Sequence, residues 1–560
     1  MKGLPSFKGS PGREITAVMW LYWILLVLLL LAVLRRLLRG RSSPNPFSAD
    51  CRRPPAPLVT DKDVRKKVIK QAFSAAKVPE NLDAVVIGSG IGGLAAAVLL
   101  SKAGKRVLVL EQHGKAGGCC HTFSKKGFEF DVGIHYIGQI GERSLMRFLV
   151  DQLTEGQLQW SKMPSVFDAV VLGEPGNAKT YCLYSGNKEY VEGLKKQFPD
   201  EAVAIEKFVR LVKRVAQGIT HMAILKMVPV PLVKFLSRTG LLAWFSPFFK
   251  MTSQSLTDVV SELTTNEELR AVFSYIFPTY GVSVQKDQDL VNVFAPIVIS
   301  DAGIFNTYER LLPAEIRTLP DIQAQLRMVD HGLSGLSVFI GLNGSKEELG
   351  LEGTNYFIYS HQNLDEAMNC FFTASKEEAA ENIPVLFVTS PSSKDPTWQE
   401  RYPGKSTLCI LAFAQYEWFE EWKEETVQKR GTKYESLKNA MVESILKTVL
   451  KLYPHLEDKI ECISSGSPLT NQHYIASPKG ELYGAAHSIS RLQAEATATL
   501  RPQTCVPNLY LTGQDIFLCG FMGALQGAVL CASAVLQRNL YSDMLRLWRN
   551  SPAKNSKKKD

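Results

Sequence analysis

The chain has 560 residues, of which 45% are hydrophobic and 21% are charged, as in ordinary folded proteins. This composition excludes a collagen, a wholly disordered chain and a small disulfide scaffold, and at roughly 150 residues per domain the length predicts three or four domains. The net charge of +9 is spread over the whole sequence and does not favour a nucleic-acid partner. No Cys/His cluster has zinc-ligand spacing, and the adjacent Cys119-Cys120 pair favours reduced cysteines.

The first 41 residues contain an uninterrupted apolar stretch of 18 residues, Ala17 to Leu34. The eleven Leu, Ile and Val residues between Leu21 and Leu34 sum to roughly −3 to −7 kcal/mol of insertion free energy. Four arginines lie within the next seven residues, and the sequence after the apolar stretch has no small-residue pattern of a signal-peptide cleavage site. This pattern predicts a retained membrane anchor rather than a removed signal peptide, with the body on the cytosolic side. The terminal Lys557-Lys558-Lys559-Asp560 has the form of an endoplasmic-reticulum retrieval signal, although a solvated basic tail explains it equally well.

The body follows a linker, residues 42–80, whose five prolines between Ser42 and Pro57 predict an extended spacer. A strand (84–87), a glycine turn, a helix (92–102) and a second strand (106–110) then predict one βαβ unit. Residues 144–274 have helical periodicity, and further strands are expected at 336–341, 356–359, 385–389 and 407–414. A strand at 509–511 and a small-residue helix at 522–536 precede the basic tail, 541–560.

The turn of the βαβ unit reads Gly88-Ser89-Gly90-Ile91-Gly92-Gly93, and Glu111 ends the next strand. Gly88 permits the tight turn, Gly90 lets the backbone approach a pyrophosphate, and Gly93 allows close packing of helix and strand. Glu111 is placed to accept a hydrogen bond from a ribose hydroxyl. A purely structural turn is the weaker alternative, because strand, helix and acid are all in place. The motif predicts a dinucleotide site.

The residues around this motif favour FAD over NAD. Gly117 and Gly118 follow the ribose acid, where the backbone can run beside a long dinucleotide. Near the other end, Gly513 and Asp515 follow the strand at 509–511, before a helix whose N-terminus favours negative charge. The sequence therefore predicts an α/β fold with a discontinuous Rossmann-like FAD-binding domain, formed by residues 81–143 and 496–540. Between them we expect a helical substrate region (144–290) and a stretch (291–495) that forms a mixed-sheet α+β substrate domain and returns to the FAD-binding domain.

These motifs resemble the FAD-dependent phytoene desaturase and carotenoid isomerase superfamily. The resemblance covers nearly everything from Ser43 to Lys559, and the residues that carry it also include Phe130 to Gly138, Tyr275 to Gly281 and Leu511 to Phe517. It implies saturation of the 13,14 double bond of all-trans-retinol, with FAD supplying hydride and NAD(P)H or another donor recharging the flavin. Desaturation, isomerisation or amine oxidation is the weaker alternative.

The reaction also needs polar groups close to the flavin. Asp131, His135 and Tyr136 are candidates for groups near the flavin because they follow the pyrophosphate segment on a predicted strand, but hydrogen-bonded core residues would show the same pattern. The aromatic stretch from Ala223 to Phe249 is expected either to lie in the core or to line a tunnel for a lipid substrate.

The chain departs from the family at one place. The resemblance implies a segment of several dozen residues, with a Tyr-Pro-x-Gly-Gly motif, after Gly281, whereas here Gly281 is followed directly by Val282. Such a loss would remove strand partners from a parallel sheet. A second hypothesis is therefore a catalytically impaired scaffold or regulatory isoform of the enzyme.

Overall fold

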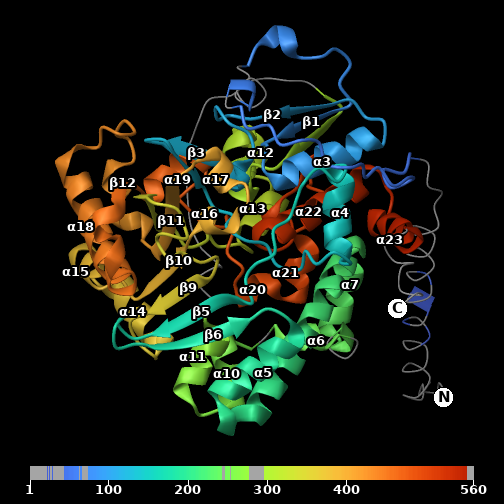
Figure 1. The fold of residues 1–560 in the computed structure, drawn as a ribbon. Helices are drawn as coiled ribbons and strands as arrows, with labels where there is room; N and C mark the ends of the chain where they lie inside the picture. The colour runs from blue at the N-terminus through green and yellow to red at the C-terminus, as the bar shows by residue number, and fades with distance from the viewer. Residues whose placement is uncertain are drawn as a thin grey trace, which may run out of the picture.

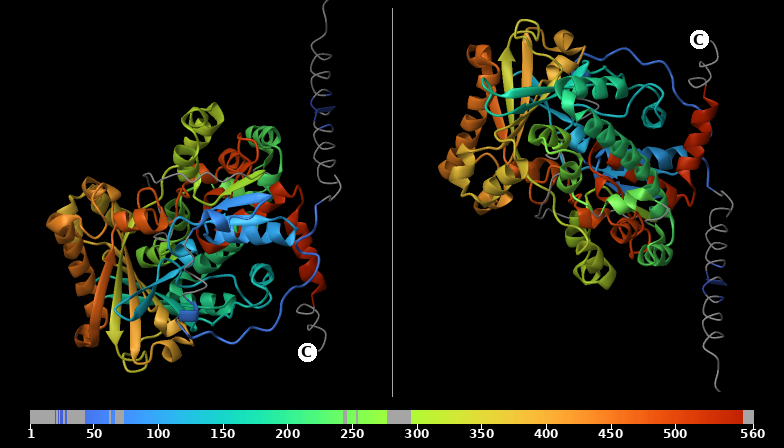
Figure 2. Two further views of the ribbon diagram at one scale, coloured as in Figure 1. Left: turned by 90° about the horizontal axis from the view of Figure 1, so that it is seen from above. Right: turned by 90° about the horizontal axis from the view of Figure 1, so that it is seen from below.

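The computed structural model describes residues 43–61, 63–65, 73–242, 246–252, 254–276 and 295–551, together with Trp20, Tyr22, Ile24, Leu25 and Leu28. Two sheets dominate the described body and lie toward opposite sides of it, as both views in Figure 2 show. The predicted α/β class with a Rossmann-like domain is confirmed.

The smaller sheet brings together strands from both ends of the chain. All its neighbouring strands are parallel, in the order β13 (Leu509–Leu511), β7 (Ile297–Ser300), β1 (Ala84–Ile87) and β2 (Val107–Leu110). Helices α3 (Ile91–Lys102) and α22 (Gly520–Val535) pack against each other beside this sheet (Figure 1). Both helices are rich in alanine and glycine, which lets their backbones approach closely, and ten of the sixteen residues of α22 are buried.

The smaller sheet and its helices form one lobe of the body. The larger sheet has seven strands and forms the second lobe. Its order is β12 (Ile460–Gly466), β8 (Gly335–Asn343), β11 (Lys405–Phe413), β10 (Val385–Thr389), β9 (Asn355–Tyr359), β5 (Val166–Leu172) and β6 (Lys179–Tyr184). All neighbours are antiparallel except β5 and β9, which are parallel. Helices α14 (Leu364–Thr373), α15 (Lys376–Glu381) and α18 (Gly431–Leu452) cover this lobe (Figure 1). A hairpin, β3 (Thr122–Lys125) and β4 (Phe128–Asp131), lies between the lobes, with Phe128 and Phe130 packed on Phe339 of β8.

The periodicity of residues 144–274 predicts helices, but the region is not wholly helical. It contains α4 (Leu145–Leu153), α5 (Asn187–Gln197), α6 (Ala202–Met227), α7 (Val230–Arg238), α9 (Pro247–Met251), α10 (Leu256–Leu263) and α11 (Glu267–Ser274). It also supplies β5 and β6: β5 pairs with β9, a strand about 190 residues later, and β6 pairs with β5. Within the stretch 223–249, Leu232, Val233 and Phe248 are buried, and none of its described residues lines the large cleft described below. Here the core interpretation is favoured over the tunnel.

The described part of the proline-rich linker lies against the body and does not project from it. Phe47 is 2% exposed and packs in the core of the dinucleotide domain. The Arg53 N–H donates to the Glu155 carbonyl at 2.9 Å, and the Cys51 N–H donates to Gln152 Oε1 at 3.2 Å. The expected free spacer is therefore wrong for residues 43–57, because one aromatic anchor and these hydrogen bonds hold them against α4.

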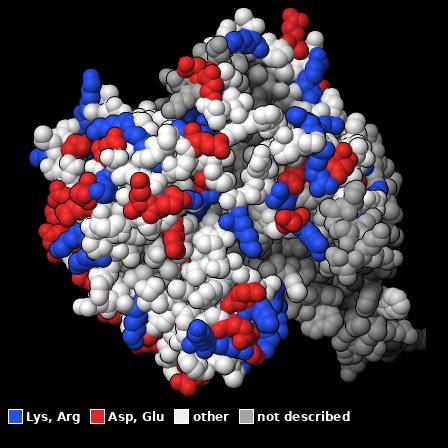
Figure 3. Space-filling view, viewed as in Figure 1, with Lys and Arg blue, Asp and Glu red and all other residues white. Residues whose placement is uncertain are grey.

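The predicted membrane segment lies almost entirely outside the described residues; the five that are described are helical and exposed. In the described part of the chain, no single helix is long and apolar enough to cross a bilayer, and α22 with α23 (Leu540–Asn550) meets that test only as a pair bent by 113°. The Gly281–Val282 junction and residues 552–560 also lie outside the described residues. On the face in Figure 3, basic and acidic side chains are interspersed.

Candidate functional site

A cleft of about 1280 Å³ lies between the two lobes and is lined by residues from both ends of the chain. One wall is the turn after β1, residues 88–92, and another is the turn after β13, residues 512–515. The two turns touch: a Cβ placed on Gly92 would lie 2.6 Å from the Cα of Gly513. The structure therefore brings together the early and late glycine motifs that the sequence predicts to share one cofactor.

The first turn has the geometry of a dinucleotide-binding turn. Gly88 has φ +97°, which favours glycine, and a Cβ on Gly93 would overlap the Gly88 carbonyl. Gly90 precedes α3 and leaves the helix N-terminus open to the cleft, where backbone N–H groups attract phosphate. Gly93 does not line the cleft, so its role is packing.

Glu111 is held in place by the same turn. Its carboxylate accepts hydrogen bonds from the Ser89 N–H at 3.1 Å, from the Ser89 hydroxyl and from the His113 N–H at 2.9 Å. Burial would raise the pKa of Glu111, but the hydrogen bonds from His113 and Ser89 outweigh it and lower the pKa to about 2. Glu111 is therefore ionised at neutral pH.

The second predicted glycine pair is tied to this arrangement. The Gly117 N–H donates to the Ser89 hydroxyl at 3.1 Å, and a Cβ on Gly118 would lie 3.1 Å from the Gly90 Cα. Gly118 lines the cleft and Gly117 does not. All ten cysteines are free, which confirms the reduced interpretation, and burial raises the pKa of Cys119 to about 11.

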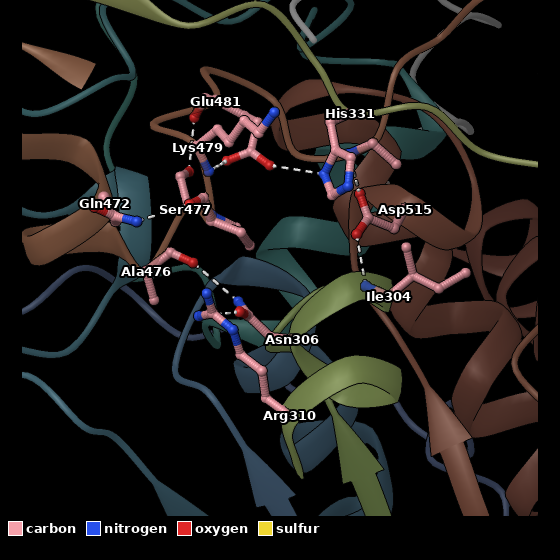
Figure 4. Close-up of polar contacts among 12 residues, drawn as sticks. Ile304, Asn306, Arg310, His331, Gln472, Ala476, Ser477, Lys479, Glu481 and Asp515 are labelled. Atoms are coloured by element: carbon pink, nitrogen blue, oxygen red, sulfur yellow. Dashed lines mark hydrogen bonds and ion pairs between the residues drawn. The ribbon is translucent and has the colours of Figure 1, made fainter. Parts of the chain in front are cut away.

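Asp515 holds the second turn rather than offering free oxygens to the cleft. Its carboxylate accepts from the backbone N–H of Ile304 at 2.8 Å (Figure 4) and from that of Ala485 at 2.9 Å. Buried Arg491 donates to the Asp515 carbonyl at 2.5 Å. Asp515 lines the cleft, but its side chain links three chain segments and positions Gly513. The prediction that Asp515 contacts the cofactor therefore stays a prediction.

The polar residues in Figure 4 extend this framework along one side of the cleft. Asn306 begins a π-helix, η5 (Asn306–Leu311), and donates to the Ala476 carbonyl at 2.9 Å. Arg310 donates to Asn306 Oδ1 at 2.8 Å and also lines the cleft. These contacts hold the 476–485 loop against the dinucleotide domain.

Asp301 is the residue of the site that sequence reasoning missed. It directly follows β7, its N–H donates to the Ile87 carbonyl at 2.7 Å, and its carboxylate lies against Gly90, Gly92 and Gly513. Burial chiefly raises its pKa, to about 7; the Gly93 N–H opposes this, whereas the Asp515 and Glu111 carboxylates add to it. The only signal in the sequence was an acid after a short apolar run, and nothing local shows that this strand lies beside β1.

Of the three candidate reaction residues, His135 and Tyr136 line the cleft beside Phe387 of the larger sheet, and Asp131 does not line it. Only Asp131 is on a strand; β4 ends there, and His135 and Tyr136 follow in a loop, contrary to the prediction. His135 Nδ1 is 3.5 Å from Asp131 Oδ2, and the His135 ring lies on Phe387, with centroids 6.0 Å apart. The Tyr136 hydroxyl instead donates to Asp168 Oδ2 at 3.4 Å.

Tyr136 is thus part of a buried polar network. Asp168 also accepts from the Tyr275 hydroxyl and from Asn355, each at 2.8 Å, and burial raises its pKa. Lys394 donates to Asn355 Oδ1 at 2.6 Å, and burial lowers the pKa of Lys394 to about 8. Asp168 does not line the cleft, so the Tyr136 hydroxyl is turned into the protein while Tyr136 still contributes to the wall. The adjoining wall is aromatic: Phe339, Phe357 and Phe387.

One family model agrees with this dinucleotide-site geometry. Residues 86–153 match the family model described as an NAD(P)-binding Rossmann-like domain. Among solved structures, putrescine oxidase bound to putrescine is 15% identical, with a TM-score of 0.48, and the match covers 83% of this chain and 99% of that one.

Much closer relatives exist among curated sequences. All-trans-retinol 13,14-reductase of Homo sapiens is 51% identical, over 94% of this chain and 98% of the human protein, and that of Rattus norvegicus is 50% identical, over 96% and 100%. A Danio rerio protein named inactive all-trans-retinol 13,14-reductase is 34% identical, over 90% and 94%. At this identity and coverage, the chain belongs to the all-trans-retinol 13,14-reductase family.

Proposed function

We propose that this protein is an FAD-dependent oxidoreductase that saturates the 13,14 double bond of all-trans-retinol. One observation carries the proposal: the two glycine turns meet at one cleft whose far wall is aromatic. A nucleotide site alone would need only the first turn. The second turn and the apolar wall suit a cofactor that reaches from a ribose acid to a greasy substrate.

The residues present fit FAD. Glu111 is ionised and lies at the adenosine end, where a carboxylate pairs with ribose hydroxyls. Gly90 and the N-terminus of α3 offer backbone N–H groups to the pyrophosphate, and a Cβ at position 90 would lie 2.6 Å from Asp301 Oδ2. Gly118 and Gly513 leave room on either side of the path. When bound, reduced flavin supplies the hydride, and we propose that NAD(P)H or another donor restores it.

Saturation also needs a proton, and we propose that His135 delivers it. His135 lines the cleft, and Asp131 lies close enough to hold its Nδ1, which leaves Nε2 for the substrate. Catalytic hydrogen bonds are often long before substrate binds, so the 3.5 Å separation is compatible with this role. Tyr136 is the weaker candidate because its hydroxyl donates to buried Asp168. The aromatic wall would exclude water from the polyene.

The test is a visible spectrum of the full-length protein in mild detergent, followed by anaerobic mixing of the reduced protein with all-trans-retinol. We expect a flavin spectrum that reoxidises on mixing, with dihydroretinol as the product. His135→Gln should keep the flavin and lose at least about tenfold in reoxidation rate, whereas Tyr136→Phe should lose much less. A colourless protein that FAD does not reconstitute would refute the proposal.

A second candidate, a catalytically impaired isoform, is favoured by the length of the chain. The alignment with the Rattus norvegicus relative spans 609 positions, whereas 96% of this 560-residue chain is about 538 residues. About 70 positions therefore face no residue of this chain. In the described structure β2 is an edge strand with every residue only half-buried, as expected if a partner strand is missing. Equal turnover of this chain and a version with the segment restored would exclude this candidate.

We further propose that residues 17–34 attach the protein to the endoplasmic-reticulum membrane with the body in the cytosol. The uninterrupted apolar run and the arginines after it support this placement. Alkaline extraction of microsomes should leave the protein in the membrane, and protease added outside intact microsomes should digest the body. Protection of the body from that protease would reverse the orientation.

A further inference from the structure

Asp301 places a carboxylate where the dinucleotide-binding turn should receive a phosphate. A Cβ on Gly90 would lie 2.6 Å from Asp301 Oδ2, and one on Gly513 would lie 2.5 Å from Asp301 Oδ1. The carboxylate also accepts a hydrogen bond from the Gly93 N–H in the first turn of α3. Backbone N–H groups of that turn are the donors that bind pyrophosphate in this kind of site. Asp301 and a bound pyrophosphate would therefore share the same small region.

The groups that face Asp301 are mostly acidic. Glu111 after β2 and Asp515 after β13 are carboxylates, and Cys119 and Cys120 of η2 (Gly118–Cys120) and Cys531 of α22 are thiols. Burial and the two carboxylates raise the pKa of Asp301 to about 7, against the effect of the Gly93 N–H. At neutral pH its side chain is thus divided between the neutral and charged forms even without a cofactor.

We propose that Asp301 must be protonated for the pyrophosphate of FAD to bind at the N-terminus of α3, so that cofactor binding takes up one proton. This inference rests on the proposed flavin function. Two phosphate charges beside an ionised, half-buried carboxylate would repel it in a region of low dielectric. A neutral carboxyl removes that repulsion and gains an O–H that can donate to a phosphate oxygen. Asp301 is thus a positioning residue whose charge sets cofactor affinity.

Proton uptake fixes how the affinity must depend on pH. Below the pKa of Asp301 the Kd for FAD should be constant, and above it the Kd should rise about tenfold per pH unit. The phosphate diester of FAD does not itself titrate near neutrality. Glu111 does not contribute to this slope, because its pKa of about 2 keeps it ionised throughout.

The experiment measures the Kd of FAD for full-length, flavin-depleted protein in mild detergent, by quenching of FAD fluorescence from about pH 5.5 to about pH 9. Wild type should show the break near neutrality, and Asp301→Asn should bind with a nearly constant Kd that is lower than wild type at the alkaline end. Glu111→Gln is the matched control: its affinity should fall at every pH while the slope remains. Calorimetric titration of wild type in buffers of different ionisation enthalpy should show uptake of about one proton above the break.

The outcomes separate this inference from the proposed function. If wild type binds FAD with a Kd that does not change with pH, or if Asp301→Asn keeps the full slope, the role of Asp301 is refuted and the flavin function stands. If wild type binds no FAD at any pH, both are refuted. Should Asp301→Asn fail to fold, the proton uptake of wild type decides, and zero uptake above the break overturns the inference.

Discussion

Replacing Gly92 by alanine tests the contact between the two ends of the chain. The added Cβ would meet the Asp301 carboxylate, and it would lie 2.6 Å from the Cα and 2.8 Å from the N of Gly513, whereas ordinary contact begins at 3.4 Å. The Asp301 side chain can rotate away, but the two Gly513 atoms are backbone, so the turns would have to separate by up to about 0.8 Å. The separation would move apart the two cleft walls that these turns form.

Two opposing effects set the size of the change. Alanine is favoured over glycine inside a helix by about 1 kcal/mol, and overpacking costs about 1–3 kcal/mol. We therefore expect the flavin-free protein to lose about 0–2 kcal/mol of unfolding free energy. Cofactor binding should suffer more, because a displacement approaching 1 Å weakens a preorganised site by up to about a hundredfold.

The assay is the ratio of flavin to protein absorbance after purification, with a thermal unfolding curve for each variant. Gly114→Ala is the control: it lies in the same domain, and its Cβ would meet nothing within 4 Å. Gly92→Ala should lose most of its flavin, and Gly114→Ala should keep it. A Gly92→Ala protein with full flavin and unchanged unfolding would refute the packing of the two turns described above.

Three further variants have signs fixed by the structure. Glu111→Gln should weaken FAD binding about ten- to a hundredfold by titration, since a charged hydrogen bond contributes about 1.5–3 kcal/mol. The pKa of Glu111 is lowered to about 2, so the contribution of its carboxylate to folding stability should be constant above about pH 5 and disappear as the pH falls toward 2. Asp515→Asn should cost about 2–5 kcal/mol of unfolding free energy in denaturant titration, because the N–H of either Ile304 or Ala485 loses its acceptor. A cost below about 1 kcal/mol would contradict the structural role of Asp515. Asp301→Asn should stabilise the flavin-free protein by up to about 4 kcal/mol at pH 8. The raised pKa of Asp301 means that wild type loses folding stability as the pH rises from 3.8 to about 7. A stability gain that does not grow with pH would contradict the raised pKa of Asp301.

Local patterns in the sequence were sufficient to predict the first strand, the glycine turn and the acid of the dinucleotide domain. The strand at 84–87 was predicted with its observed bounds, and the glycine turn and Glu111 fall where the fingerprint places them. These features depend on residues a few positions apart: apolar β-branched runs form strands, and a turn with positive φ requires glycine. The meeting of Gly513 with this turn was also predicted, from two motifs that suit one cofactor.

Other features depended on partners distant in the sequence, and only the tertiary structure decided them. Strands β5 and β6 lie in a stretch that reads as helical, and β5 is fixed by pairing with β9 far along the chain. Phe47 is an anchor only because the dinucleotide domain offers it an apolar site. The pKa of Asp301 is raised chiefly by burial, because β7 lies beside β1 and brings that carboxylate against the glycine turn, where two other acids add to the effect. Local propensity determines which segments form strands and turns, but burial and electrostatic energy depend on which of them become neighbours in space.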